Sequence, residues 1–182
     1  MDNSIFKEFK IASKADINII EKYKDLIPLQ LKSAWENYGF GTILNGYLKI
    51  VNPDEYQSII NMSYFRANVS KPILITAFGD IITWEENKYI GIIRYNKGNF
   101  NIISSGFKYF FSDLLDEYFV GKHLQVDKYI QAIEKYGELE YDECFGYVPL
   151  LGLGGSEKVE NLRKVKIREH IELITQLVGK IE

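Results

Sequence analysis

The side chains that most often perform acid–base or nucleophilic chemistry are rare in this chain of 182 residues, which has two histidines and one cysteine. His123 follows Lys122 after an aromatic-rich segment, and His170 stands beside Glu169 near the start of the last predicted helix. A catalytic histidine needs a partner group within hydrogen-bond reach that explains its activation. The local sequence indicates no such pair, and we interpret both histidines as surface or helix-terminal residues.

The single cysteine, Cys144, directly follows Asp142 and Glu143. Neighbouring carboxylates raise the pKa of a thiol and oppose its activation, so we expect a structural cysteine that is buried or partly buried. One cysteine forms no internal disulfide, which favours a reducing compartment. Two histidines and one cysteine also leave few ligands for zinc. We therefore expect no catalytic, cofactor-binding or metal-binding residues.

A glycine-rich stretch at residues 152–156, Gly-Leu-Gly-Gly-Ser, invites comparison with a phosphate-binding loop. It lacks the Gly-Lys-Ser/Thr ending and the basic residue that would meet the phosphates. Glycines in such a stretch also permit a tight turn or close packing against the following helix. We favour the structural interpretation.

An acid-rich segment spans residues 134–143 and contains five acids, one lysine and two tyrosines. A solvated surface is the simplest interpretation. The alternative is a contact surface for a cationic partner, since carboxylates speed encounter and tyrosines supply anchors. The candidate contact residues are Glu138, Glu140, Tyr141, Asp142 and Glu143. Three further acids, Asp113, Asp116 and Glu117, extend this surface if the fold brings them near it.

The overall charge argues against nucleic acid and membrane partners. The chain has 22 basic and 25 acidic residues, a formal net charge of -3, and only four of its basic residues are arginines. Bidentate recognition of phosphates and bases usually relies on arginine. The first eight residues contain charged side chains where a secretion signal would need an uninterrupted apolar stretch. No apolar run approaches the roughly 18 residues of a membrane span. We expect a cytoplasmic protein that contacts neither nucleic acid nor membrane directly.

Hydrophobic periodicity predicts helices at both ends of the chain. Ser13 is the expected cap of a first helix, and Pro28 begins a second helix that ends at Gly39. Asn52-Pro53 predicts the start of a short third helix. The apolar spacing within residues 107–119 predicts a long amphipathic helix. Further helices are expected over residues 127–136 and in a C-terminal segment whose apolar face is Ile167, Ile171, Ile174, Val178 and Ile181.

The middle of the chain predicts a sheet. Residues 39–46 are expected to form a glycine-punctuated loop before a strand at 47–51. Four β-branched and aromatic runs follow at residues 72–78, 81–85, 89–95 and 100–104, separated by short turn sequences. Short connections join only antiparallel neighbours. We predict an α+β fold with a mostly antiparallel central sheet, a meander over about residues 72–104, flanked by N-terminal and C-terminal helices in one compact unit.

Two groups of motifs resemble known families. The pattern Ile27-Pro28, Trp35, Tyr38-Gly39-Phe40-Gly41, Asn45-Gly46-Tyr47-Leu48 and Val51-Asn52-Pro53-Asp54-Glu55-Tyr56 resembles the GAD-like domain, a bacterial module distantly similar to the SUKH immunity superfamily. The stretch 145–155, with Glu160-Asn161-Leu162 and His170-Ile171, resembles the C-terminal domain of immunity proteins paired with type VI secretion DNase effectors. The expected division is a GAD-like region at residues 1–105 and an immunity-type region at 106–182.

The resemblance implies an immunity protein, a cytoplasmic partner that binds a cognate toxin, possibly a DNase, and occludes its active site. It supplies no catalytic residues and leaves the oligomeric state and the toxin undefined. The shared residues make physical sense as core, turn and cap positions: Trp35, Gly39, Gly41, Gly46, Pro53, Tyr56, Gly154 and Gly155. The alternative is a non-catalytic SUKH-like ligand-binding or regulatory module without a toxin partner. An enzyme is a third interpretation, which a deep pocket pairing His123 or His170 with a carboxylate would favour.

Overall fold

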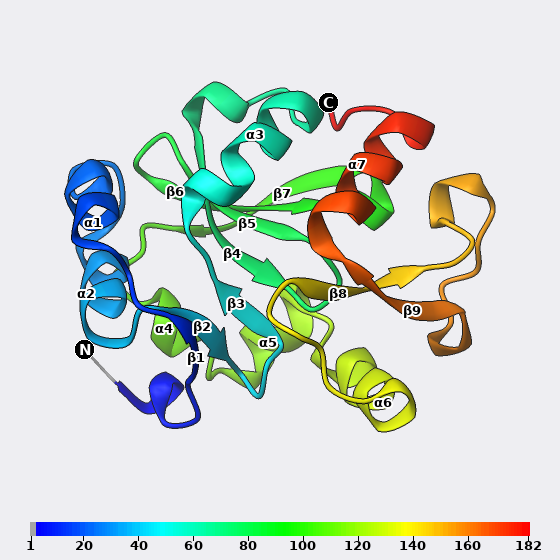
Figure 1. Ribbon diagram of the computed structural model, residues 1–182, viewed down its shortest axis with the longest axis horizontal. Coiled ribbons are helices and arrows are strands. Elements are labelled where there is room, and N and C mark those ends of the chain that lie inside the picture. Colours follow the sequence, from blue (N-terminus) through cyan, green and yellow to red (C-terminus); the bar gives the residue numbers. More distant parts are fainter. Residues whose placement is uncertain (1–2) are drawn as a thin grey trace.

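The computed structural model describes residues 3–182 and contains a seven-stranded antiparallel sheet whose strands follow one another in chain order (Figure 1). The predicted meander is therefore confirmed, and it continues through three strands towards the N-terminus. The strands are β1 (Lys10–Ser13), β2 (Phe40–Ile43), β3 (Leu48–Ile50), β4 (Ser70–Thr76), β5 (Ile81–Glu85), β6 (Tyr89–Arg94) and β7 (Asn99–Ser105). A separate hairpin consists of β8 (Glu143–Tyr147) and β9 (Leu162–Lys166).

Helices cover both faces of the sheet (Figure 1). The helices α3 (Pro53–Ser63) and α7 (Ile167–Val178) lie on one face and contact each other. The opposite face is covered by α1 (Ile17–Tyr23), α2 (Leu29–Tyr38), α4 (Phe110–Asp113), α5 (Glu117–His123) and α6 (Val126–Tyr136). Short 3-10 turns are η1 (Asn3–Phe6), η2 (Ala67–Val69), η3 (Tyr95–Lys97), η4 (Leu151–Leu153) and η5 (Val159–Asn161). The predicted α+β class is confirmed.

Two hydrophobic cores lie against the two faces of the sheet. Successive strand residues point to opposite faces, so Ile82 and Ile92 enter the core beneath α2, α4 and α6. Their neighbours Ile81 and Ile93 enter the core beneath α3 and α7. The central strands are consequently buried on both faces, and every residue of β5 is buried.

The predicted helix starts and ends are correct in part. Asn52 caps α3 by accepting a hydrogen bond from the backbone N–H of Asp54, with Pro53 as the first helical residue. The prediction that Ser13 caps the first helix is wrong, because Ser13 ends β1 and Asp16 is the cap. Pro28 is the residue before α2 rather than its first residue.

The predicted loop at residues 39–46 is instead a β-hairpin. β2 and β3 pair from Gly41↔Ile50 to Ile43↔Leu48, and the turn between them runs through Leu44, Asn45 and Gly46, all with positive φ. The glycines that suggested a loop are required by close packing instead. A side chain at Gly41 would meet the backbone of β1, because its Cβ would lie 2.3 Å from the carbonyl oxygen of Lys10.

The prediction of one long helix over residues 107–119 is wrong. The chain forms only the short helices α4 and α5, with a break at residues 114–116. Asp116 adopts an extended conformation and caps α5, its carboxylate accepting from the N–H of Phe119 at 2.8 Å. Leu115 and Tyr118 therefore point outwards, with 45% and 76% of their surface exposed, although both fit the apolar stripe in sequence.

The C-terminal third is packed into the same two cores. Phe145 of β8 belongs to one core and its neighbour Cys144 to the other, and the N–H of Phe145 donates to the carbonyl of Ala77 at 2.7 Å. The last predicted helix ends at Val178, and Ile181 pairs with the end of α3 through hydrogen bonds to Ser63 and Phe65. The division of the chain at residue 105 stays a prediction. No helix within residues 3–182 is long and apolar enough to cross a membrane.

The contact between β1 and β2 gives a stability test. We expect Gly41→Ala to lower the free energy of unfolding by about 1–3 kcal/mol, because its Cβ would be forced against Lys10 and the ring of Phe9. Gly121→Ala is the matched control, since a Cβ there meets nothing within 4 Å and alanine favours the helix α5. Urea unfolding of both variants is the measurement, and equal stabilities would contradict the proposed close approach.

Candidate functional site

The two histidines are held by structural contacts. His170 is helix-terminal as predicted, in the first turn of α7, but it is buried rather than on the surface. Its Nε2 lies 3.3 Å from the side-chain oxygen of Asn96, and its ring packs over Gly146. Burial lowers the pKa of His170 to about 4, so the ring is neutral near pH 7. His123 ends α5 with its ring against Phe119, and among residues 3–182 no carboxylate pairs with it.

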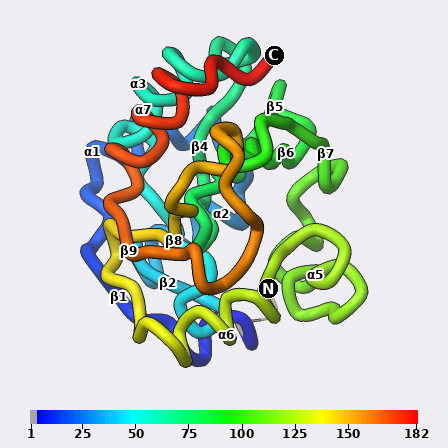
Figure 2. Tube along the Cα trace, turned by 90° about the vertical axis from the view of Figure 1, so that its right-hand side faces the viewer, coloured from blue at the N-terminus to red at the C-terminus, as the bar shows by residue number. Residues whose placement is uncertain are grey.

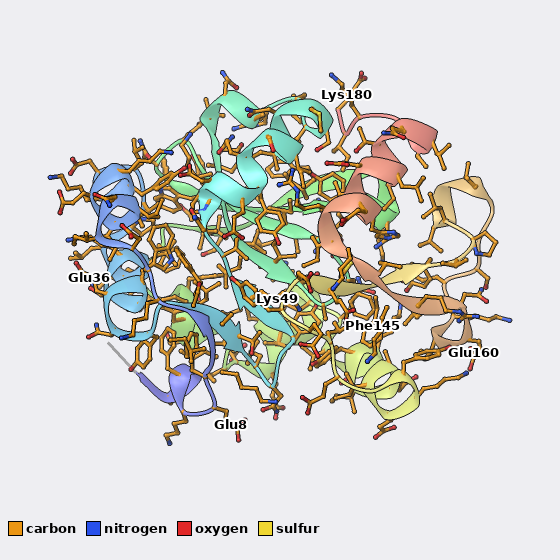
Figure 3. The ribbon with its side chains drawn as sticks, in the orientation of Figure 1. Glu8, Glu36, Lys49, Phe145, Glu160 and Lys180 are labelled. Carbon is orange, nitrogen blue, oxygen red and sulfur yellow. The ribbon has the colours of Figure 1, made fainter. Side chains whose placement is uncertain are left out.

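Cys144 is fully buried in β8, which agrees with the structural interpretation. Burial, more than the neighbouring acids, raises the pKa of its thiol to about 12. Lys49 of β3 is buried nearby, and Figure 3 shows Lys49 and Phe145 in the interior while Glu8, Glu160 and Lys180 lie outside. Burial lowers the pKa of Lys49 to about 8.

Asp80 is the acid whose environment is least favourable for its charge. It lies in the turn between β4 and β5 with 3% of its surface exposed. Burial raises the pKa of Asp80 to about 7, although the positive charges of Arg94, Lys97 and Lys128 oppose this shift. Perturbed acids mark functional sites in many enzymes. No group of three His, Cys, Asp or Glu side chains within residues 3–182 is arranged to hold a metal ion.

The glycine-rich stretch forms a turn. Gly154 ends η4 with φ +87°, and a Cβ at Gly155 would lie 2.1 Å from the carbonyl oxygen of Pro149. Two lysines contact a carboxylate of the same loop: Glu157 accepts from Lys128 at 2.5 Å and lies 3.3 Å from Lys97. The carboxylate of Glu157 therefore already pairs with these two lysines, which supports the structural interpretation of the glycines.

The other residues of the family pattern occupy core, turn and cap positions. Trp35 and Tyr56 are buried, Gly39 follows α2 with φ +81°, and Gly46 completes the turn before β3 with φ +89°. Pro53 is the first residue of α3. None of these five residues presents an exposed side chain, which agrees with a structural role.

The acid-rich segment 134–143 forms the end of α6 and the loop before β8, and lysines neutralise most of it. Glu138 pairs with Lys10 of β1 at 3.0 Å. Asp142 and Glu143 both pair with Lys166 of β9, at 2.8 and 3.6 Å. Of the four acidic candidates, only the carboxylate of Glu140 has no cationic partner among residues 3–182. The segment thus offers less free negative charge than its sequence indicates.

The side chain of Tyr141 is held by structural contacts. Its hydroxyl donates to the carbonyl oxygen of Ile50 at 2.7 Å, and its ring contacts both cores. A shallow groove of about 620 Å³ separates this loop from β1 and is lined by Ile11, Thr42 and Glu140, among others. The other acids named in the sequence are Asp113 at the end of α4, Asp116 as the cap of α5 and Glu117 as its first residue, and they have no ion-pair partner within residues 3–182.

A second groove, which the sequence did not predict, lies between β7 and the end of α5. Its volume is about 530 Å³, and its walls include Arg94, Asn101 and Lys122. Arg94 donates to the side-chain oxygen of Asn101 at 2.7 Å and to the carbonyl of His123 at 3.0 Å. Neither Arg94 nor Lys122 forms an ion pair within residues 3–182. The sequence alone does not show that these two cations lie in one groove without an ion pair.

Comparisons with known proteins identify both halves of the chain. Residues 6–97 match the GAD-like domain, and residues 104–178 match the family described as T6SS immunity protein Tdi1, C-terminal. A search of the curated proteins found no match. A solved structure, the crystal structure of Atu4351 from Agrobacterium tumefaciens, is similar with 20% identity and a TM-score of 0.78, covering 97% of this chain and 89% of that chain. Both sequence resemblances are confirmed, and the solved structure shows the same fold.

The buried Asp80 gives a pH-dependent prediction. Between its usual pKa of 3.8 and about 7, the folded protein binds a proton at Asp80 that the unfolded chain does not. This group therefore lowers the free energy of unfolding as pH rises, by up to about 1.4 kcal/mol per pH unit. We expect Asp80→Asn to become more stable relative to wild type as pH rises across this window.

Urea unfolding of Asp80→Asn and wild type at several pH values is the measurement, because the difference cancels other titrating groups such as His170. The matched control is Asp127→Asn, which removes an exposed carboxylate on α6 rather than a buried one. A difference that does not change with pH in Asp80→Asn would show that the acid is not destabilised by burial.

Proposed function

The chain belongs to the GAD-like domain family, and from this membership and its C-terminal immunity-type domain we propose an immunity protein that binds a cognate secreted toxin and neutralises it. The match of residues 104–178 to the T6SS immunity family carries this proposal. In this proposal, the protein acts in the cytoplasm and occludes the active site of the toxin. We propose a DNase as the toxin class, as the sequence resemblance implies.

The engagement of the reactive side chains supports a binding role. His170 and Cys144 are buried among structural contacts, and Glu157 already occupies the lysines near the glycine-rich turn. The exposed part of the chain instead presents large apolar side chains such as Phe65, Tyr109 and Tyr118, with exposures of 59%, 63% and 76%. Aromatic side chains of this size are enriched at protein interfaces.

The acid-rich loop has a limited role in this proposal. Because Glu138, Asp142 and Glu143 are already paired with lysines, they offer a toxin little free negative charge. Because Lys166 pairs with two acids and Glu140 has no cationic partner among residues 3–182, the segment keeps a small excess of negative charge. Exposed charges of this kind affect the association rate more than the stability. We propose that this loop steers a cationic toxin surface during encounter.

A ligand-binding or regulatory module is the alternative, and one cavity favours it. A mostly apolar cavity of about 310 Å³ lies between α7 and the turns η3 and η4, lined by Tyr95, Leu150, Leu151, Ile174 and Val178 among others. A small apolar molecule would fit there. Stabilisation of the purified protein by such a molecule, without any toxin partner, would favour this second function.

Complex formation tests the immunity proposal directly. We expect the purified protein to form a stoichiometric complex with the toxin encoded beside its gene, and co-expression to protect cells from that toxin. Size-exclusion chromatography with light scattering measures the stoichiometry, and survival of cells measures the protection. A neighbouring toxin that binds nothing and kills equally well in the presence of this protein would overturn the proposal.

Charge reversal tests the role of the acid-rich loop. We expect the combined variant Glu138→Lys, Glu140→Lys, Asp142→Lys and Glu143→Lys to slow association with the toxin by roughly fivefold at low salt. The deficit should shrink at high ionic strength, since salt screens exposed charges. Stopped-flow fluorescence gives the association rates. A variant whose rate equals that of wild type at all salt concentrations would show that this loop does not steer the toxin.

A further inference from the structure

The two edges of the central sheet differ in how they are protected. β1 is a four-residue edge with a register shift between Ile11 and Ser13 and a charged residue, Lys10, within it. β7 is a seven-residue edge, Asn-Phe-Asn-Ile-Ile-Ser-Ser, with no charged residue and no proline. Short length, lysine and bulges are the usual devices that prevent an edge from pairing with another strand. β7 has only one of them, a bulge at Ile103.

The outer side of β7 has no backbone partner in the part of the chain that the structure describes. β7 is the last strand of the sheet and pairs only with β6. No backbone hydrogen bond outside that pairing involves residues 99–105. In an antiparallel strand, alternate residues direct their N–H and C=O groups away from the existing neighbour. Figure 2 shows β7 at the margin of the molecule, above α5. The regular part of this open edge is Asn99–Ile102.

The two flanks of the edge have different chemistry. On the α3 side, Phe100 contacts the ring of Tyr64 at 5.1 Å, which in turn contacts the exposed ring of Phe65 at 5.1 Å. Ile102 has 44% of its surface exposed and also borders the groove on the α5 side. On the α5 side is the groove whose walls include Arg94 and Lys122, two cations that form no ion pair within residues 3–182. One flank is therefore apolar and aromatic, and the other is basic.

We propose that β7 is the main docking edge for the toxin, which adds an extended segment to the sheet with acidic side chains towards Arg94 and Lys122. This inference rests on the proposed immunity function. Main-chain hydrogen bonds to an edge strand provide affinity, and alternate side chains provide specificity. The alternation of the added strand places acids in the basic groove and apolar residues against Ile102 and Phe65.

A second copy of this chain is a poorer occupant of the same edge. Two β7 strands paired with each other would contribute no acid, since residues 99–105 contain none. The pairing would instead bring two copies of the Arg94 and Lys122 groove close together without a counter-charge. Like charges at an interface oppose association. The free cations therefore select an acidic partner strand over self-pairing.

Two substitutions with matched controls test the proposal on the full-length protein. Ile102→Lys places a charge on the edge, and Ile130→Lys is its control because Ile130 on α6 has a closely similar exposure, 46% against 44%. Lys122→Glu reverses one groove cation, and Lys158→Glu is its control because Lys158 is also exposed and has no ion-pair partner within residues 3–182. Calorimetric titration with the adjacently encoded toxin measures the affinity.

We expect both test variants to bind the toxin at least tenfold more weakly and both controls to remain within threefold of wild type. Backbone amide exchange gives an independent measurement: residues 99–105 should become protected when wild type binds the toxin. A complex that forms with unchanged affinity in the test variants, or without protection of these amides, overturns this inference but leaves the immunity proposal intact. A wild-type protein that forms no complex overturns both.

The test also distinguishes the other occupants of this edge. A wild-type dimer that Ile102→Lys dissociates would show that a second copy pairs with β7, which contradicts the proposal. Abolished binding in the combined acid-loop variant, together with normal binding in Ile102→Lys, would place the main contact beside β1 instead. Thermal unfolding of each variant separates lost binding from lost folding, and retained stability with lost affinity supports docking at β7.

Discussion

The burial of the central sheet on both faces is the constraint on which the other features of this protein depend. An antiparallel sheet usually leaves one face to water, but β5 here is buried along its whole length. Its residues Ile81 and Ile82 enter different cores, so helices must cover both sides. The N-terminal region supplies α3 for one face and α1 and α2 for the other. The C-terminal region supplies α7 for the first face and α4 to α6 for the second.

This two-sided burial explains how the C-terminal hairpin is attached. β8 meets the sheet at the β4–β5 turn, where the N–H of Phe145 donates to Ala77 and the thiol of Cys144 lies against Gly79. Gly79 has φ +77°, and a Cβ there would lie 3.1 Å from that sulfur. Cys144 is therefore a packing residue, and its buried position accounts for the raised pKa more than any neighbouring acid does.

Local sequence predicted the elements whose signals are local. The cap and proline of α3 and the short turns of the meander required no knowledge of the rest of the chain. Two of the errors arise where another interaction competes with the sequence pattern, a local cap in one segment and a tertiary contact in the other. Residues 107–119 have the spacing of one helix, but Asp116 caps a new helix and turns Tyr118 outwards. Residues 39–46 contain glycines typical of a loop, but position 41 requires glycine because the backbone of β1 packs directly against it.

The candidate surfaces show the same limit for electrostatics. Sequence reveals a run of acids at 134–143, but the lysines that neutralise it come from β1 and β9, which are distant in sequence. Conversely, Arg94 and Lys122 are ordinary isolated cations in sequence, and only the tertiary structure shows that they line one groove and form no ion pair within residues 3–182. A charge that lacks an internal partner is available to an external one without breaking an existing pair. The free cations beside the open edge of β7 are therefore better placed for recognition than the more numerous, but paired, acids beside β1.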